Sequence, residues 1–126
     1  ALDEYLGQIR EYEQITVDAY RDDWKTQRIV ERTLQMMIET CLDISGHIIS
    51  DADFPVPETY ADMFRVLAAN HVLDPSRLDA FEKMARFRNI VVHDYEKIDP
   101  GIVVGVLRNN LSDFVLFKAS ILQYLR

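Results

Sequence analysis

The fold is decided by the stretch VERTLQMMIETCLDISGHII, residues 30–49, in which apolar side chains recur at steps of three and four residues. That spacing places them on one face of an α-helix, which repeats about every 3.6 residues. No proline occurs from Asp22 to Ile49, and Gly46 is the only glycine there. We therefore predict one long helix over residues 22–49. Its inward face is expected to carry Val30, Leu34, Met37, Ile38, Cys41, Leu42, Ile48 and Ile49.

Helical periodicity on both sides of this stretch predicts four further helices, over residues 2–14, 58–70, 75–91 and 100–125. Residues 50–57 contain two prolines and form the main loop, because proline cannot continue a helix. Asp74-Pro75 and Asp99-Pro100 are typical helix starts, with aspartate as the N-cap. The residues expected to face inward from the helix at 58–70 are Tyr60, Met63, Phe64, Leu67 and Ala68. We predict a single all-α domain over residues 1–126, an up-and-down bundle of about five helices.

Composition restricts the classes of function. The chain carries 14 Lys and Arg against 21 Asp and Glu, a formal charge of −7. A broad nucleic-acid surface needs several cations to neutralise phosphates, so anion binding here must rest on a few local arginines. A single cysteine, Cys41, excludes an internal disulfide and a cysteine-based zinc site. No apolar run approaches the roughly 18 to 20 residues of a membrane span, and we expect a cytoplasmic protein.

The most unusual stretch is RFRNIVVHDY, residues 86–95, which combines two arginines, an amide, a histidine, a carboxylate and a phenol. In an ideal helix, Arg88 and His93 lie about 140° apart around the axis. Asn89 shares a face with His93, whereas Arg88 shares a face with Tyr95. Two arrangements bring these groups together. Either the β-branched run at residues 90–92 loosens the helix, so that His93 turns toward Arg88, or a two-fold dimer opposes two copies of the stretch.

These residue types fit phosphodiester chemistry. An imidazole accepts and donates protons near neutral pH, and a guanidinium makes planar, bidentate contacts to phosphate oxygens. Together they suit metal-free RNA cleavage, in which the 2′-hydroxyl attacks the adjacent phosphorus and DNA is spared. A purely structural interpretation also stands. In it, His93 and Tyr95 cap a helix end, Arg88 pairs with Glu39 or Asp43, and nothing reacts.

Other polar groups carry weaker signals. The polar stripe of the long helix is either a solvent-exposed face or a polar surface that contacts residues 88–95 of another helix or subunit. Its members are Arg28, Arg32, Glu39 and Asp43. Asp43 and His47 are four residues apart, which is more typical of a helix hydrogen bond than of a metal site. Cys41 is expected in the core, and His71 near a helix C-terminus.

Residues 84–95 resemble the signature of HEPN-domain proteins, in the Arg-x4-His-x-Tyr form of HepT-like toxins from HepT/MntA (type VII) toxin–antitoxin systems. Further segments resemble that family in the same order, namely Glu31-Arg32, Glu39, Asp43, residues 47–49, residues 57–60, Phe64 and Ile98-Asp99. The resemblance covers almost the whole chain. It implies an all-α homodimer in which the motif residues of both chains line a cleft that cleaves RNA without a metal ion or other cofactor.

The resemblance also implies roles for individual residues. Arg88 would bind phosphate, His93 would be the general acid/base, and Asn89 would orient RNA or His93. Tyr95 would be the tyrosine that a minimal nucleotidyltransferase antitoxin adenylylates, and a bulky anion there would obstruct the cleft and repel RNA. The alternative function is a non-catalytic HEPN-like interaction module that binds a nucleotidyltransferase partner or a nucleotide.

Overall fold

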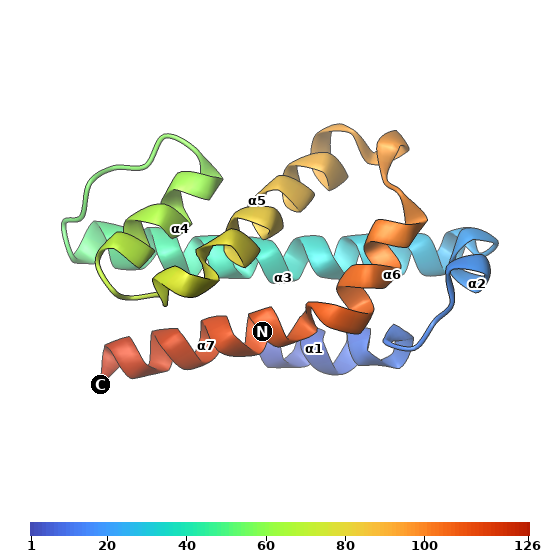
Figure 1. The fold of residues 1–126 in the computed structure, drawn as a ribbon, viewed down its shortest axis with the longest axis horizontal. Helices are drawn as coiled ribbons and strands as arrows, with labels where there is room; N and C mark the ends of the chain where they lie inside the picture. Colours follow the sequence, from blue (N-terminus) through green and yellow to red (C-terminus); the bar gives the residue numbers. More distant parts are fainter.

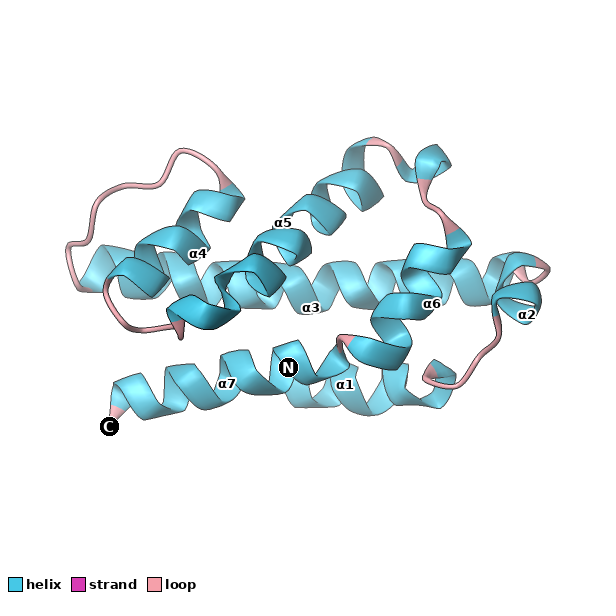
Figure 2. Cartoon of the chain, in the orientation of Figure 1, coloured by secondary structure: helices cyan, strands magenta, loops and turns pink.

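The computed structural model describes residues 1–126, which form seven α-helices and three short 3-10 helices with no strand. In chain order these are α1 (Leu2–Ile9), η1 (Arg10–Tyr12), α2 (Val17–Arg21), α3 (Trp24–Asp51), α4 (Tyr60–Ala69), η2 (Pro75–Arg77), α5 (Leu78–His93), η3 (Tyr95–Lys97), α6 (Pro100–Asn109) and α7 (Leu111–Leu125). Figure 2 shows how little of the chain lies in loops. The prediction of an all-α fold is confirmed.

The long helix α3 is the central element of the bundle. In Figure 1 it runs along the whole long axis, with α4 and α5 on one side and α1 and α7 on the other. It contacts α1, α2, α4 and α5. Its first turn is capped by Asp23, whose side chain accepts a hydrogen bond from the backbone N–H of Thr26 at 3.1 Å. Every apolar position predicted to face inward from this helix is buried.

A single cluster of 26 buried apolar residues forms the core. At its centre the rings of Phe64, Phe81 and Phe117 pack in tilted and edge-on orientations, with centroids 5.7 to 6.2 Å apart. These three rings join α4, α5 and α7. Because the loss of one buried phenylalanine ring costs about 3–5 kcal/mol, this contact contributes much of what holds α4 and α5 in place.

Two of the predicted helices are divided in the structure. The helix expected over residues 100–125 breaks at Asn110, which separates α6 from α7. Asn110 closes α6 by donating its backbone N–H to the carbonyl of Val106, and its side chain donates to the carboxylate of Asp113 at 3.1 Å. The first predicted helix ends at Tyr12, and the short α2 follows, with Thr16 as its N-cap. The prediction of about five helices was therefore too low.

Local signals placed the two helix starts at Asp74 and Asp99 correctly. The side chain of Asp74 accepts a hydrogen bond from the backbone N–H of Ser76, and that of Asp99 accepts one from Gly101. His71 follows α4 in the left-handed region, with φ of 58°, just beyond the helix C-terminus where it was expected. None of the helices combines the length and the apolar character needed to cross a membrane.

Candidate active site

The unusual stretch forms the C-terminal half of α5. This helix remains regular through residues 90–92 to His93, and the backbone N–H of Asp94 still donates to the carbonyl of Ile90 at 2.8 Å. The proposed loosening before His93 is therefore wrong. Val91 packs into the protein interior, and such packing outweighs the low helix propensity of a β-branched run. Arg88 and His93 consequently stay on different faces, about 140° apart.

Arg88 points from α5 toward α3 and α4. Its Nε and Nη2 atoms both donate to Oε1 of Glu39, at 3.2 and 3.0 Å. Gln35, one turn earlier on α3, donates from Nε2 to the same oxygen at 3.2 Å. The guanidinium carbon lies 4.8 Å from the centroid of the Tyr60 ring. The Arg88 side chain is only 15% exposed, so its position is closely defined by its neighbours.

Tyr60 was expected to face inward, and this prediction was wrong. It is the first residue of α4 and is 37% exposed, with one face of its ring against Arg88. A cation held over an aromatic face is attracted by the ring quadrupole, which explains why Tyr60 stays at the surface instead of entering the core. Met63 and the other residues predicted to face inward from this helix are buried or half-buried.

The other motif residues lie in the open. Asn89 is exposed, and its Oδ1 accepts a hydrogen bond from Nη1 of Arg88 at 3.4 Å. His93 is the exposed last residue of α5. Tyr95 opens η3 and is 58% exposed. Neither the imidazole nor the phenol is hydrogen-bonded within the chain, so both are available to a ligand or a second chain.

The polar stripe of α3 does not contact residues 88–95 as a whole. Glu39 alone meets the motif, whereas Arg28 pairs with Glu31 on its own helix at 3.2 Å. Arg32 and Asp43 are exposed and form no ion pair. The pairing of Arg88 with Glu39 was foreseen in the structural interpretation of the sequence, but the contributions of Gln35 and Tyr60 were not. Gln35 could have been found from its four-residue spacing to Glu39 on one helix face.

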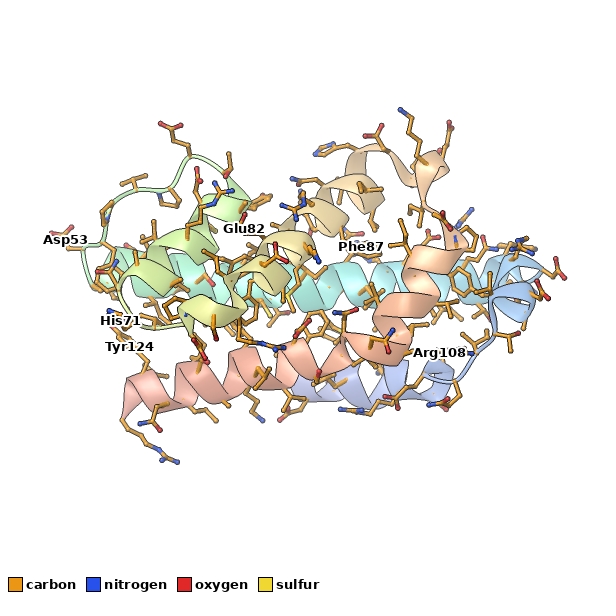
Figure 3. All side chains as sticks on the ribbon, in the orientation of Figure 1. Asp53, His71, Glu82, Phe87, Arg108 and Tyr124 are labelled. Atoms are coloured by element: carbon orange, nitrogen blue, oxygen red, sulfur yellow. The ribbon has the colours of Figure 1, made fainter.

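Two remaining features do not involve Arg88, His93 or Tyr95. Burial raises the pKa of the Cys41 thiol to about 12, which keeps it protonated and unreactive near neutral pH. An apolar pocket of about 490 Å³ lies between α3, α5 and α6, and Phe87, labelled in Figure 3, contributes to its wall. None of Arg88, His93 and Tyr95 lines this pocket. No three His, Cys, Asp or Glu side chains converge as a metal site would require.

Known structures with this fold define its class. The chain superposes with a TM-score of 0.89 on a chain of a toxin–antitoxin crystal structure with AMP-PNP, at 30% identity, covering 97% of this chain and 92% of that chain. A tri-AMPylated HEPN toxin of Shewanella oneidensis, solved in complex with an MNT antitoxin, gives a TM-score of 0.87 at 30% identity, covering 97% and 91%. The class is therefore the helical HEPN toxin domain.

Sequence comparison identifies the family within that class. The chain belongs to the ribonuclease HepT-like family, whose model matches residues 2–121. It is 36% identical over 98 residues to an mRNA nuclease HepT of Shewanella oneidensis, covering 78% of this chain and 74% of that protein. It is 30% identical over 121 residues to a tRNA nuclease HepT of Aphanizomenon flos-aquae, covering 96% and 82%. The resemblance inferred from residues 84–95 is confirmed at the level of the family.

Proposed function

We propose that the protein is the toxin of a toxin–antitoxin pair and that it is a metal-independent endoribonuclease whose active site is a cleft between two copies of the chain. The observation that carries this proposal is the regular course of α5. It exposes His93 and holds Arg88 on another face, only five residues away. One chain cannot point both groups at one phosphate, whereas a two-fold axis beside this end of α5 brings two arginines and two histidines together.

In the proposed reaction the RNA supplies its own nucleophile. The 2′-hydroxyl oxygen bonds to the adjacent phosphorus as the bond from phosphorus to the 5′-oxygen breaks, leaving a 2′,3′-cyclic phosphate and a free 5′-hydroxyl. His93 acts as general acid/base: it accepts the proton of the 2′-hydroxyl and then donates a proton to the departing 5′-oxygen. Arg88 stabilises the charge that develops on the phosphate oxygens. Asn89, hydrogen-bonded to Arg88, helps to orient the RNA.

The proposal includes a protein partner. Both superposed toxins were solved as toxin–antitoxin structures, one with AMP-PNP and one with the toxin AMPylated in an MNT complex. We assign the corresponding partner of this chain to the minimal nucleotidyltransferases, with Tyr95 as the adenylylated residue. The exposure of Tyr95 and its lack of a hydrogen-bond partner support this assignment, since a modifying enzyme must reach the phenol. The proposal treats residues 1–126 as one HEPN-like domain acting in the cytoplasm.

The function is tested by RNA cleavage in EDTA. We expect Arg88→Ala and His93→Ala each to reduce cleavage at least about a hundredfold, because each removes charge stabilisation or proton transfer. Both variants should remain folded dimers, and an all-DNA analogue of the substrate should survive. Cleavage that persists in both variants, or that requires a divalent metal, contradicts the mechanism. Antitoxin binding without any cleavage by the wild-type dimer would instead support the interaction module.

A further inference from the structure

The two hydrogen bonds from Arg88 to Glu39 use only one edge of its guanidinium. Nε and Nη2 both point at Oε1 of Glu39, which occupies the side edge of the group. The end edge, formed by Nη1 and the second hydrogen of Nη2, carries only the 3.4 Å contact to Asn89. A guanidinium binds phosphate through two parallel N–H groups on one edge. The contact with Glu39 therefore leaves an edge that can bind a phosphate in this way.

The carboxylate that holds Arg88 is itself fixed. Oε1 of Glu39 accepts three N–H groups, two from Arg88 and one from Gln35. Gln35 and Glu39 are four residues apart on α3, so they share a face of the most extensively packed helix in the molecule. This arrangement fixes the distance between α3 and the guanidinium.

Tyr60 is a further residue that restrains the side chain of Arg88. The guanidinium of Arg88 lies over the Tyr60 ring, with its central carbon 4.8 Å from the ring centroid. Tyr60 begins α4, and the N-cap Thr59 secures this helix end by accepting a hydrogen bond from the backbone N–H of Asp62 at 3.0 Å. Residues of α3 and α4 thus both hold this arginine of α5, through hydrogen bonds to one edge of its guanidinium and through an aromatic ring beneath it.

We propose that Gln35, Glu39 and Tyr60 form a clamp that positions Arg88 so that its end edge faces the scissile phosphate. The inference rests on the proposed function, since it assigns residues that act through Arg88. A free arginine must give up rotamer freedom when it binds phosphate, whereas the clamped side chain has given it up before RNA arrives. The clamp residues are positioning residues, because only Arg88 contacts the substrate.

A competing role for Glu39 predicts the opposite effect. If its carboxylate served to neutralise Arg88 and exclude phosphate, its removal would raise activity. Arginine remains charged whatever its neighbours, and Glu39 occupies the edge opposite to the one that would bind phosphate. The geometry therefore favours positioning over inhibition.

The test is the steady-state cleavage of RNA in EDTA by purified dimers. Glu39→Ala should lower kcat/KM by about a hundredfold, mainly through kcat, because a misplaced arginine loses its contact with the transition state. Tyr60→Leu should lower it by about fivefold, the value of an exposed cation–π contact. Glu39→Gln and Tyr60→Phe should recover most of the activity, since they keep the acceptor oxygen and the ring.

The matched control is Glu82→Ala. Glu82, labelled in Figure 3, accepts a hydrogen bond from Arg65 at 2.9 Å, so this variant removes another arginine–glutamate pair between α4 and α5. It should leave kcat and KM unchanged. The ¹⁵Nε–H signal of Arg88 gives a second readout, which should be protected in the wild type and in Tyr60→Phe but exchange rapidly in Glu39→Ala.

The outcomes separate the two proposals. If Arg88→Ala is inactive but Glu39→Ala and Tyr60→Leu cleave like the wild type, the clamp is wrong and the proposed function stands. Higher activity in Glu39→Ala also overturns the clamp. If the wild type does not cleave RNA, both proposals fail together. Should Glu39→Ala not fold, the comparison of Tyr60→Leu with Tyr60→Phe decides the matter.

Discussion

The guanidinium of Arg77 donates from Nη2 to Oδ1 of Asp113 at 2.7 Å, which ties the start of α5 to the first turn of α7. The Asp113 side chain is only 5% exposed, whereas that of Arg77 is 44% exposed. The other carboxylate oxygen accepts from Asn110 at 3.1 Å. Asp113 is thus a buried charge with both oxygens satisfied, and one of its two partners is reachable from the surface.

This relationship predicts that Arg77→Ala lowers the free energy of unfolding by about 3 kcal/mol, because it strands a buried carboxylate without its cation. Urea denaturation followed by circular dichroism measures the loss. Arg10→Ala is the control, since it removes an exposed pair with Glu13 at 3.4 Å and should cost less than about 0.5 kcal/mol. Equal effects of the two substitutions would contradict the assignment.

Alkaline pH should destabilise the fold through Cys41. Burial raises the pKa of its thiol from 9.0 to about 12, so the folded protein keeps a proton that the unfolded chain releases. Stability is therefore unaffected below about pH 9 and falls as the pH rises from there toward 12. At pH 10.5 the expected loss from this group is about 2 kcal/mol.

The alkaline loss is measured as the change in urea midpoint between about pH 8 and pH 10.5. Cys41→Ala should flatten the dependence, even if it lowers the midpoint at both pH values. Burial and the nearby Glu31 carboxylate also raise the pKa of the Tyr20 hydroxyl, so some dependence should remain in this variant. An unchanged slope would show that Cys41 does not contribute.

A site shared between chains predicts complementation. Mixed dimers of an Arg88→Ala chain and a His93→Ala chain retain an intact arginine on one chain and an intact histidine on the other. We expect mixing and refolding the two inactive variants to restore measurable RNA cleavage, because the intact groups meet across the two-fold axis. Each variant refolded alone is the control. A mixture that forms mixed dimers and remains inactive would contradict the shared cleft.

Modification at Tyr95 is tested by mass spectrometry after incubation with ATP and the cognate nucleotidyltransferase. We expect adenylyl groups on Tyr95 and a parallel loss of cleavage, because the added phosphates repel RNA. Tyr95→Phe should stay active and unmodified. Tyr124, at the opposite end of the molecule from α6 in Figure 3 and 41% exposed, provides the control substitution Tyr124→Phe. Adenylylation confined to other residues would remove Tyr95 from the proposal.

The sequence predicted those features that depend on neighbouring residues along the chain. The buried face of α3 follows from the three- and four-residue spacing of its apolar side chains, and the caps at Asp74 and Asp99 are contained within single turns. The break at Asn110 was not predictable in this way. Asn110 bonds to Asp113 only three residues away, but Asp113 is held in place by Arg77, which lies 36 residues earlier in the chain.

The same distinction between local and long-range features applies to the candidate site. Helix geometry alone separated Arg88 from His93, and the regular course of α5 bears this out. The position of Tyr60 against Arg88 depends on how α4 packs beside α5, which apolar periodicity does not specify. A tyrosine in an apolar stripe looks like a core residue until its cationic neighbour is known. Sequence reasoning therefore identified the proposed reactive groups but not the contacts that surround Arg88.

The rigidity of α5 gives the proposed enzyme a dependence on its own abundance. A single chain presents its arginine and its histidine in different directions, so under the proposed mechanism a monomer would not cleave RNA. Where dimers are scarce, their number grows with the square of the chain concentration. RNA cleavage in the cell would then begin only above a threshold concentration of the chain. Slow synthesis of the toxin below that concentration would be tolerated even before any antitoxin bound it.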